Sequence, residues 1–205
     1  KGIKNNTFDF FWLWDDNSRR LTPTFPSGER HTFGTRWLGN APLVDECDHV
    51  CRTWHWDIEG GYQIGDDFGR DVNAGFFTAG AGHTWNQAVW EPNVWIFYDW
   101  ASGDTNPNDG QTNTFHQQYG LVHAYLGLID NIARQNISDI NGRFTVKPTK
   151  KLSVMSAIHF FDLASNDDVL YNVTGAPVGT RNTGTKVGQE LDLVATYTFH
   201  PNFNI

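Results

Sequence analysis

The sequence is poor in helix formers, in positive charge and in long apolar runs. One methionine among 205 residues and few runs of alanine, leucine, glutamate and lysine disfavour a helical bundle. Lysine and arginine number 15 against 23 aspartates and glutamates and form no basic stripe, so the net charge of −8 excludes a protein that binds nucleic-acid phosphates. The stretches freest of charge, residues 72–90 and 110–129, contain asparagine, glutamine, histidine and glycine. No helix is therefore expected to span a membrane.

Cysteine is scarce as well. The two cysteines, Cys47 and Cys51, stand in the sequence Asp-Glu-Cys-Asp-His-Val-Cys, a spacing that fits neither a redox Cys-x-x-Cys motif nor a haem site. We expect a disulfide that staples a loop. A zinc site that adds Asp45, Glu46, Asp48 and His49 is the alternative, disfavoured because no second cysteine or histidine pair follows at zinc-finger spacing.

Aromatic residues, in contrast, are abundant and alternate with polar ones. They make up 15% of the chain, while the hydrophobic total of 39% is modest but too high for a disordered chain. Residues 53–64 and 186–199 both read as strands with one apolar and one polar face. The apolar faces hold Trp54, Trp56, Ile58, Tyr62 and Ile64 in the first segment, and Val187, Leu191, Leu193, Ala195, Tyr197 and Phe199 in the second.

Further strands of similar character bring the expected number to eight, with a ninth that starts at Asn202. The expected ranges are 5–14, 31–37, 53–64, 71–84, 93–102, 138–147, 151–163 and 186–199. Most are longer than the five or six residues usual in soluble sheets, and they suit tilted strands that cross a hydrocarbon layer. Short connections alternate with long loops at about 103–137 and 164–185, as in a membrane barrel, although the connection 65–70 is too brief for that pattern.

The middle of the chain resembles the alginate export family of outer-membrane porins. The resemblance rests on Tyr-Asp-Trp-Ala-Ser-Gly-Asp-Thr-Asn-Pro-Asn-Asp-Gly at 98–110, Asn-Thr-Phe-His-Gln-Gln-Tyr at 113–119, His-Ala-Tyr-Leu-Gly-Leu-Ile-Asp at 123–130 and Gly-Gln-Glu-Leu-Asp-Leu at 188–193. It covers roughly residues 57–199 and implies a large monomeric barrel, eighteen-stranded where the family is best known. We therefore expect an all-β, antiparallel transmembrane β-barrel, of which residues 1–205 form a single domain with about half of the strands. Any leader would lie outside this chain.

The expected function is passive conduction of an anionic, alginate-like polysaccharide or other hydrophilic solutes across a bacterial outer membrane. The expected partners are outer-membrane lipid, that cargo and membrane-protein assembly partners. Alternate strand positions that face water are candidates for the channel wall and for contact with the cargo: Arg36, His55, Asp57, Glu59, Asp99, Arg143, Glu190 and Asp192. The hypothesis is that Arg36 and Arg143 contact the anionic polymer while the carboxylates position them. A mutually neutralised wall without ligand specificity is the alternative.

The long loop at 103–137 carries two further predictions. Asp104, Asn106 and Asn108 space their oxygens like a calcium loop, but no glutamate closes the cage, so an Asx turn is favoured and no cofactor is expected. Apolar residues from Val122 to Ala133 recur at helical spacing and predict a short helix that either constricts the pore or packs on the barrel rim.

Other function classes fit less well. Asp57 with Glu59, or Glu190 with Asp192, could suggest a glycosidase pair, but two such residues on one strand face project in parallel with no evident cleft. No nucleophile-elbow, zincin or P-loop motif is present, so no catalytic residue is expected. A secreted carbohydrate-binding β-sandwich and a structural outer-membrane component of a larger assembly remain the alternatives.

Overall fold

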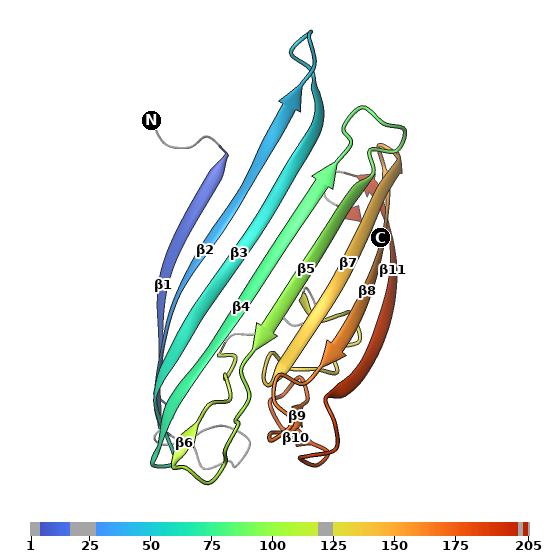
Figure 1. The fold of residues 1–205 in the computed structure, drawn as a ribbon. Coiled ribbons are helices and arrows are strands. Elements are labelled where there is room, and N and C mark those ends of the chain that lie inside the picture. The colour runs from blue at the N-terminus through green and yellow to red at the C-terminus, as the bar shows by residue number, and fades with distance from the viewer. Residues whose placement is uncertain (1–4, 17–27, 119–124, 201–202, 205) are drawn as a thin grey trace.

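The protein forms one curved antiparallel sheet whose long strands follow each other in chain order (Figure 1). The computed structural model describes residues 5–16, 28–118, 125–200 and 203–204. The long strands are β1 (Asn6–Asp16), β2 (Glu29–Val44), β3 (Val50–Asp67), β4 (Arg70–Thr84), β5 (Asn93–Ala101), β7 (Ile137–Thr149), β8 (Leu152–Asp162) and β11 (Lys186–His200). The short strands are β6 (Gln111–Thr112), β9 (Leu170–Tyr171), β10 (Pro177–Val178) and β12 (Phe203–Asn204).

All eight expected long strands are confirmed, and the ninth begins one residue after its predicted start, at Phe203. Several are longer than predicted: β3 spans 18 residues and β2 spans 16, where the sequence pattern indicated only 31–37 for β2. The strand order runs from β1 at one edge to β12 at the other, and these two edges do not pair with each other, so the described sheet is not closed. The long strands do not divide into two packed sheets, which removes the β-sandwich alternative.

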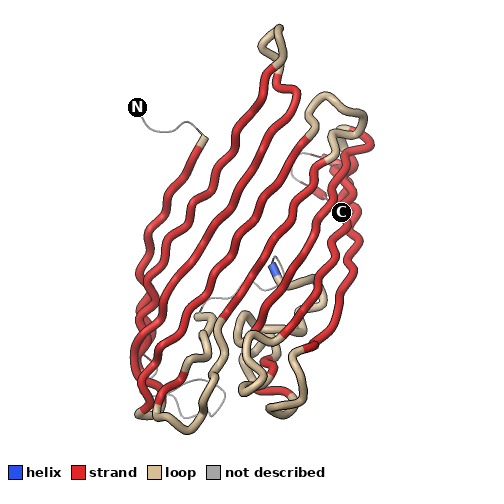
Figure 2. Tube along the Cα trace, in the orientation of Figure 1, coloured by secondary structure: helices blue, strands red, loops and turns tan. Residues whose placement is uncertain are grey.

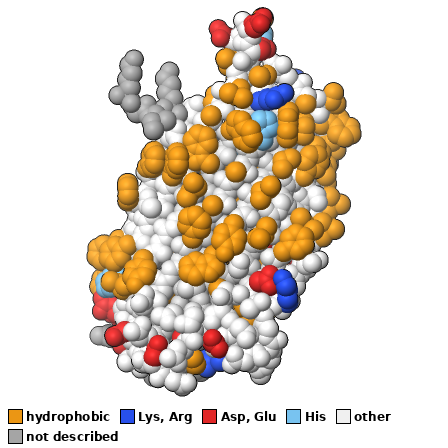
Figure 3. All heavy atoms as spheres, in the orientation of Figure 1, with side chains coloured by type: hydrophobic (Ala, Val, Ile, Leu, Met, Phe, Trp, Pro, Cys, Tyr) orange, Lys and Arg blue, Asp and Glu red, His pale blue; other side chains and the backbone are white. Residues whose placement is uncertain are grey.

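The two faces of the sheet differ in chemistry as the alternation predicts. Figure 3 shows apolar side chains spread over the outer face, with charged groups gathered toward its two ends. Trp54, Tyr62 and Ile64 on β3 are exposed there, as are Leu191 and Leu193 on β11. Val187 departs from the prediction: a register shift between Lys186 and Gly188 turns it toward the buried core instead.

Short and long connections lie at opposite ends of the strands (Figures 1 and 2). Residues 45–49, 85–92 and 150–151 connect strands at the short-turn end, and residues 102–136 and 163–185 connect them at the opposite, long-loop end. The two long loops are thus where the sequence predicts them. The β3–β4 connection remains an exception, because it is a two-residue turn, Phe68 and Gly69, at the long-loop end.

Part of the first long loop packs against the inner face of the sheet. We call residues 113–118 and 125–136 the inward segment. Its side chains Phe115, Leu126 and Ile132 join Phe76 and Phe161 of the sheet in the buried apolar cluster. The core of the molecule is therefore the contact between this segment and the sheet.

The helix expected over residues 122–133 is largely wrong. Val122 lies outside the described residues, and of residues 125–136 only Tyr125 is helical. Gly127 and Asp130 have φ values of 88° and 57°, which a right-handed helix cannot accommodate. Among the described residues, no helix is both long and apolar enough to cross a membrane.

Candidate functional site

All eight predicted wall residues lie on the inner face of the sheet. Residues paired across neighbouring strands share a face, so the strand register groups them into three adjacent rows. Arg36, Glu59 and Asp99 belong to one row, Asp57 and Glu190 to the next, and His55, Arg143 and Asp192 to the third. We call these eight residues the charged wall.

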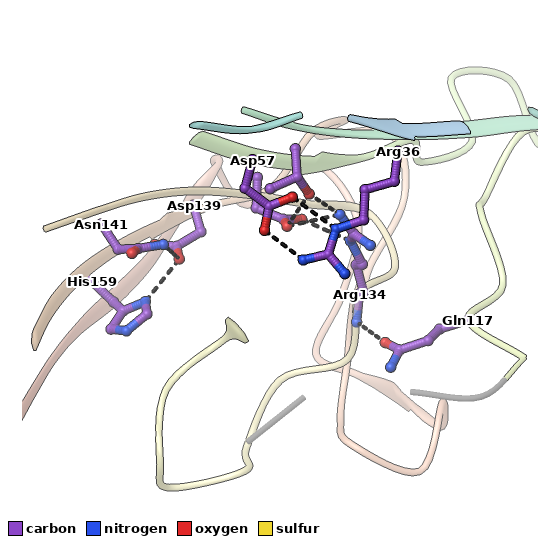
Figure 4. A network of polar contacts seen from close by, with 9 residues as sticks. Arg36, Asp57, Gln117, Arg134, Asp139, Asn141 and His159 are labelled. Atoms are coloured by element: carbon purple, nitrogen blue, oxygen red, sulfur yellow. Dashed lines mark hydrogen bonds and ion pairs between the residues drawn. The ribbon is translucent and has the colours of Figure 1, made fainter. Parts of the chain in front are cut away.

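Arg36 and Asp57 form a two-pronged ion pair within the charged wall (Figure 4). Nε of Arg36 donates to Oδ1 of Asp57 at 2.8 Å, and Nη2 donates to Oδ2 at 2.6 Å. The planar guanidinium matches the carboxylate in this geometry, which is among the strongest hydrogen-bonded charge pairs. The guanidinium is therefore held in place by Asp57, as the hypothesis from the sequence requires of the carboxylates.

A second ion pair, which no sequence pattern predicts, joins the inward segment to the charged wall. Arg134 donates from Nε and Nη2 to the two carboxylate oxygens of Asp99, both at 2.8 Å, and contacts the Thr78 hydroxyl. Its backbone N–H donates to Oε1 of Gln117 at 3.0 Å, and its guanidinium lies 4.5 Å from the Phe76 ring centroid. Arg134 directly follows the apolar residues whose spacing predicted a helix, and it lies in an irregular loop, so no local pattern marks it as a wall contact.

Glu190 holds the inward segment at a second point. Its Oε1 accepts the backbone N–H of Ile129 at 3.0 Å. Gly127, with φ of 88°, passes so close that a Cβ there would lie 2.4 Å from the Glu190 carboxylate. Glu190 thus binds loop backbone, whereas Asp57 binds a cation.

A buried histidine network occupies the inner faces of β7 and β8. Nδ1 of His159 lies 2.8 Å from Oδ2 of Asp139, which also accepts from Asn141 Nδ2 at 2.8 Å (Figure 4). Nε2 of His159 lies 3.9 Å from Asp192 Oδ2. These strands were predicted, and the period-two alternation could have placed Asp139 and His159 on the inner face. His159 therefore lies between Asp139 and the predicted wall residue Asp192 and links the two carboxylates.

Two further residues of the charged wall, Arg143 and His55, contact aromatic rings. The Arg143 guanidinium lies 5.2 Å from the Phe97 ring centroid. His55 stacks on Trp95 with centroids 5.5 Å apart, and its Nε2 lies 2.8 Å from the Thr84 hydroxyl. The charged wall therefore combines cations, carboxylates and ring faces.

Beside these contacts, a cavity of about 310 Å³ lies between the inward segment and the charged wall. Arg36, Glu59 and Arg134 line it, beside apolar residues of both the sheet and the inward segment. Cations and ring faces thus line one cavity, an arrangement that can receive an anionic sugar.

The inward segment is also tied to the second long loop, residues 163–185. The Asn136 amide donates to the backbone oxygens of Ser165 and Val169 at 3.0 and 2.9 Å, and its oxygen accepts the N–H of Ser165 at 2.7 Å. The buried Asp168 carboxylate accepts from the Thr114 hydroxyl and, at 3.0 Å, from the N–H of Asp104. The two long loops therefore pack as one unit.

The predicted disulfide is not formed. Cys47 and Cys51 are both free, because Cys47 lies in the β2–β3 turn while Sγ of Cys51, on β3, lies 3.2 Å from the carbonyl oxygen of Leu43. The turn is held instead by Asp45, whose Oδ1 accepts the N–H groups of Cys47 and His49, both at 2.9 Å. The described residues contain no group of three or more His, Cys, Asp or Glu side chains placed to hold a metal ion.

The segment proposed for calcium contains consecutive Asx turns. Oδ1 of Asp104 accepts the N–H of Asn106 at 3.0 Å, and Oδ1 of Asn106 accepts the N–H of Asn108 at 3.3 Å. These oxygens therefore hydrogen-bond to backbone amides two residues further along the chain, as expected of Asx turns.

Long antiparallel strands, an apolar outer face and a charged inner face together define the class of transmembrane β-barrel proteins of the outer membrane. The particular family follows from a match of the alginate export family to residues 1–205: the chain belongs to that family. This match extends beyond the region 57–199 in which the resemblance was seen. A comparison with curated protein sequences finds no match. Membership supports polysaccharide export at the outer membrane as the broad function, in a family of transport proteins rather than enzymes.

Proposed function

We propose that the protein forms part of a passive channel that conducts an anionic, alginate-like polysaccharide across the outer membrane. The observation that carries this proposal is the cavity between the charged wall and the inward segment, lined by the guanidinium groups of Arg36 and Arg134. A polymer with one carboxylate per sugar could contact these cations in succession. The apolar residues beside them would accept the C–H faces of the sugar rings.

The ion pairs would keep the polymer from binding too tightly. Arg36 is already neutralised by Asp57, so a sugar carboxylate would replace one carboxylate by another rather than meet a bare cation. Hydrogen bonds to charged groups contribute roughly 1.5–3 kcal/mol, and an exchange of equals contributes only a fraction of that. Conduction needs sites of this kind, strong enough to attract and weak enough to release. No covalent step is required.

Blockade of the channel tests this role. In planar bilayers, trimannuronate should reduce the current of the wild-type protein, and an Arg36→Gln/Arg143→Gln double variant should need at least about 10-fold more of it for the same effect. Arg52→Gln, which removes an exposed arginine near the short-turn end of β3, is the matched control. An Arg36→Lys/Arg143→Lys variant keeps the charges and should lie between the two.

Three outcomes would contradict the proposal. If trimannuronate blocks the Arg36→Gln/Arg143→Gln variant as strongly as the wild type, these arginines do not contact the cargo. A folded protein that inserts in bilayers but passes no current would favour the structural outer-membrane component instead. Equal blockade by neutral maltotriose would indicate a general channel for hydrophilic solutes.

A further inference from the structure

A second cavity lies at the long-loop end, apart from the one beside the charged wall. Its volume is about 330 Å³, and it opens between the β3–β4 turn, the inward segment and the loop of residues 163–185. We call it the mouth pocket. The residues that line it and carry the argument are Arg30, Asp67, Arg70, His116, Tyr171 and Arg181.

The inward segment separates the mouth pocket from the wall cavity. Phe115 and Gln117 line the wall cavity, whereas the alternating neighbours Thr114 and His116 line the mouth pocket. An extended stretch of chain presents successive side chains to opposite sides, which accounts for this division. The two cavities are thus distinct sites, separated by the stretch of chain from Thr114 to Gln117.

One side of the mouth pocket is fixed by the sheet. Nη1 of Arg30 donates to Oε1 of Gln63 at 2.8 Å, and its Nη2 lies 3.1 Å from Asp67 Oδ2. The Gln63 side chain in turn bonds the backbone N–H and carbonyl of His116, at 3.1 and 3.0 Å. Arg30, Gln63 and His116 therefore form one rigid unit.

The opposite side is fixed by the second long loop. The Tyr171 hydroxyl donates to Oδ1 of the buried Asp168 at 2.9 Å. Burial, and then the Asp168 charge, raise the pKa of Tyr171, so this hydroxyl stays protonated and keeps donating. The pocket is preformed on both sides, which lowers the ordering cost of binding.

The charge of the mouth pocket is positive, although the whole chain carries −8. Three lining arginines face a single aspartate, Asp67, which is shared between Arg30 at 3.1 Å and Arg70 at 3.6 Å. Arg181 is exposed and forms no ion pair with any residue that the structure describes. Arg70 and Arg181 can therefore still neutralise an incoming anion.

The pocket also offers apolar contacts, and two of its lining residues carry buried polar atoms without a hydrogen-bond partner. Phe68, with 63% of its surface exposed, and Pro177 line it beside Tyr171. Arg30 Nε and His116 Nδ1 are buried without a hydrogen-bond partner, and both side chains are more than nine-tenths buried. Cations beside flat apolar surfaces suit a sugar that bears a carboxylate, since the ring binds the flat surface and the carboxylate binds the guanidinium.

We propose that the mouth pocket binds one carboxylated sugar unit of the polymer as it leaves the channel on the long-loop side. This inference rests on the proposed function, because the exported polymer supplies the ligand. Binding here holds the leading end of the chain beyond the inward segment, so that the polymer does not slide back while the next units pass the charged wall.

Binding of trimannuronate to the detergent-solubilised protein, measured by calorimetry, tests the mouth pocket. The wild-type protein should show two classes of site. An Arg70→Ala/Arg181→Ala variant should lose one class, with affinity for it at least about 10-fold weaker, and Arg181→Lys should retain it. The control Arg52→Ala removes an exposed arginine near the other end of the strands and should bind like the wild type.

The two proposals fail in different ways. If the Arg70→Ala/Arg181→Ala variant binds like Arg52→Ala, the mouth pocket is wrong, whatever the Arg36→Gln/Arg143→Gln variant does. If the mouth variant alone loses a site while trimannuronate never blocks current, the pocket stands and the conduction role fails. If neutral maltotriose binds the wild-type mouth pocket as tightly as trimannuronate does, the proposal that the pocket selects a carboxylated sugar is wrong.

Discussion

At the scale of single residues, two ion pairs of nearly the same geometry have different structural consequences. Arg36 and Asp57 both belong to the sheet, so their pair stabilises the charged wall alone. Arg134 and Asp99 join a loop to the sheet, so their pair also decides where the inward segment lies. Asp99 is only 2% exposed, which makes the loss of its cation costly.

Replacement of Arg134 by glutamine should therefore release the inward segment. The buried Asp99 would lose its charge partner, at a cost of about 3–5 kcal/mol, and movement of the segment would let water reach it. Single-channel conductance should rise, and the loop should become sensitive to protease. Arg36→Gln also breaks an ion pair but frees no loop, so it serves as the control. Unchanged conductance in Arg134→Gln would show that the segment is held elsewhere.

The pH dependence of the fold should depend partly on His116. Burial, and then the charge of Arg30, lower the pKa of His116 from 6.5 to about 4. The folded state therefore requires the neutral ring, and its stability is complete above pH 6.5 and falls as the pH drops toward 4. The loss should be on the order of 1–3 kcal/mol.

The temperature of thermal unfolding of the detergent-solubilised protein, measured from pH 7 to pH 4, tests this effect. His116→Gln is the comparison, because it has no charge to gain in this range. The wild-type transition should fall further than that of the variant as the pH drops. Parallel profiles would remove His116 as the cause.

The wall residues on the strands could be predicted from the sequence, whereas Arg134 in the loop could not, and the reason is physical. Residues such as Asp57 and Glu190 were found because a strand places alternate side chains on one face, so their neighbours reveal their direction. Arg134 obeys no such rule, since its direction comes from a partner 35 positions away in the chain. Long-range contacts of irregular segments leave no local pattern to detect.

At the scale of elements, strands were predictable and the loop was not. Period-two alternation is repeated over nine to 18 residues in each long strand, so a few blurred positions do not hide it. The apolar spacing in the inward segment indicated a helix, yet Leu126 and Ile132 fill the buried cluster from an irregular backbone. Backbone N–H groups of this segment find other partners instead of helical ones: that of Ile129 donates to the Glu190 carboxylate, and that of Ala133 donates to the backbone oxygen of Tyr171.

The tight approach of Gly127 to Glu190 can be tested with a matched pair of glycines. Gly127→Ala and Gly179→Ala both place a side chain at positive φ, 88° and 81°, and carry similar backbone strain of about 1–2 kcal/mol. Only the first adds a Cβ 2.4 Å from the Glu190 carboxylate, while nothing lies within 4 Å of the second. Gly127→Ala should displace that carboxylate from the N–H of Ile129, a further loss of roughly 1.5–3 kcal/mol.

Limited proteolysis of the inward segment provides the readout. Cleavage there should be faster in Gly127→Ala than in Gly179→Ala. Equal rates in the two variants would indicate that Glu190 moves aside without loss.

At the scale of the whole molecule, the modest hydrophobic total of 39% fits a protein that is apolar on its outside. Only alternate strand positions need to be apolar when one face meets lipid and the other meets water. The outer face and the membrane class were accordingly accessible from composition and pattern. The packing of the inner face was not, because it depends on how two long loops fold together.

An arginine on the outer face should reveal the lipid contact. Leu191 is 74% exposed, so Leu191→Arg would be nearly neutral in a soluble protein but should cost about 2–4 kcal/mol near the middle of a bilayer. Val178→Arg, at an exposed apolar residue of the second long loop, should cost almost nothing. Urea unfolding in lipid vesicles measures both, and equal stability of the two variants would argue against a lipid-facing β11.

The ties between the two long loops have a consequence for the order of assembly. The inward segment comes early in the chain, but the groups that secure it against its neighbour, around Ser165 and Asp168, follow β8. The inward segment can therefore form all of these hydrogen bonds only after β7 and β8 have paired and the second long loop, residues 163–185, has packed against it. We therefore expect the inward segment to reach its final position late in folding, after these strands have paired.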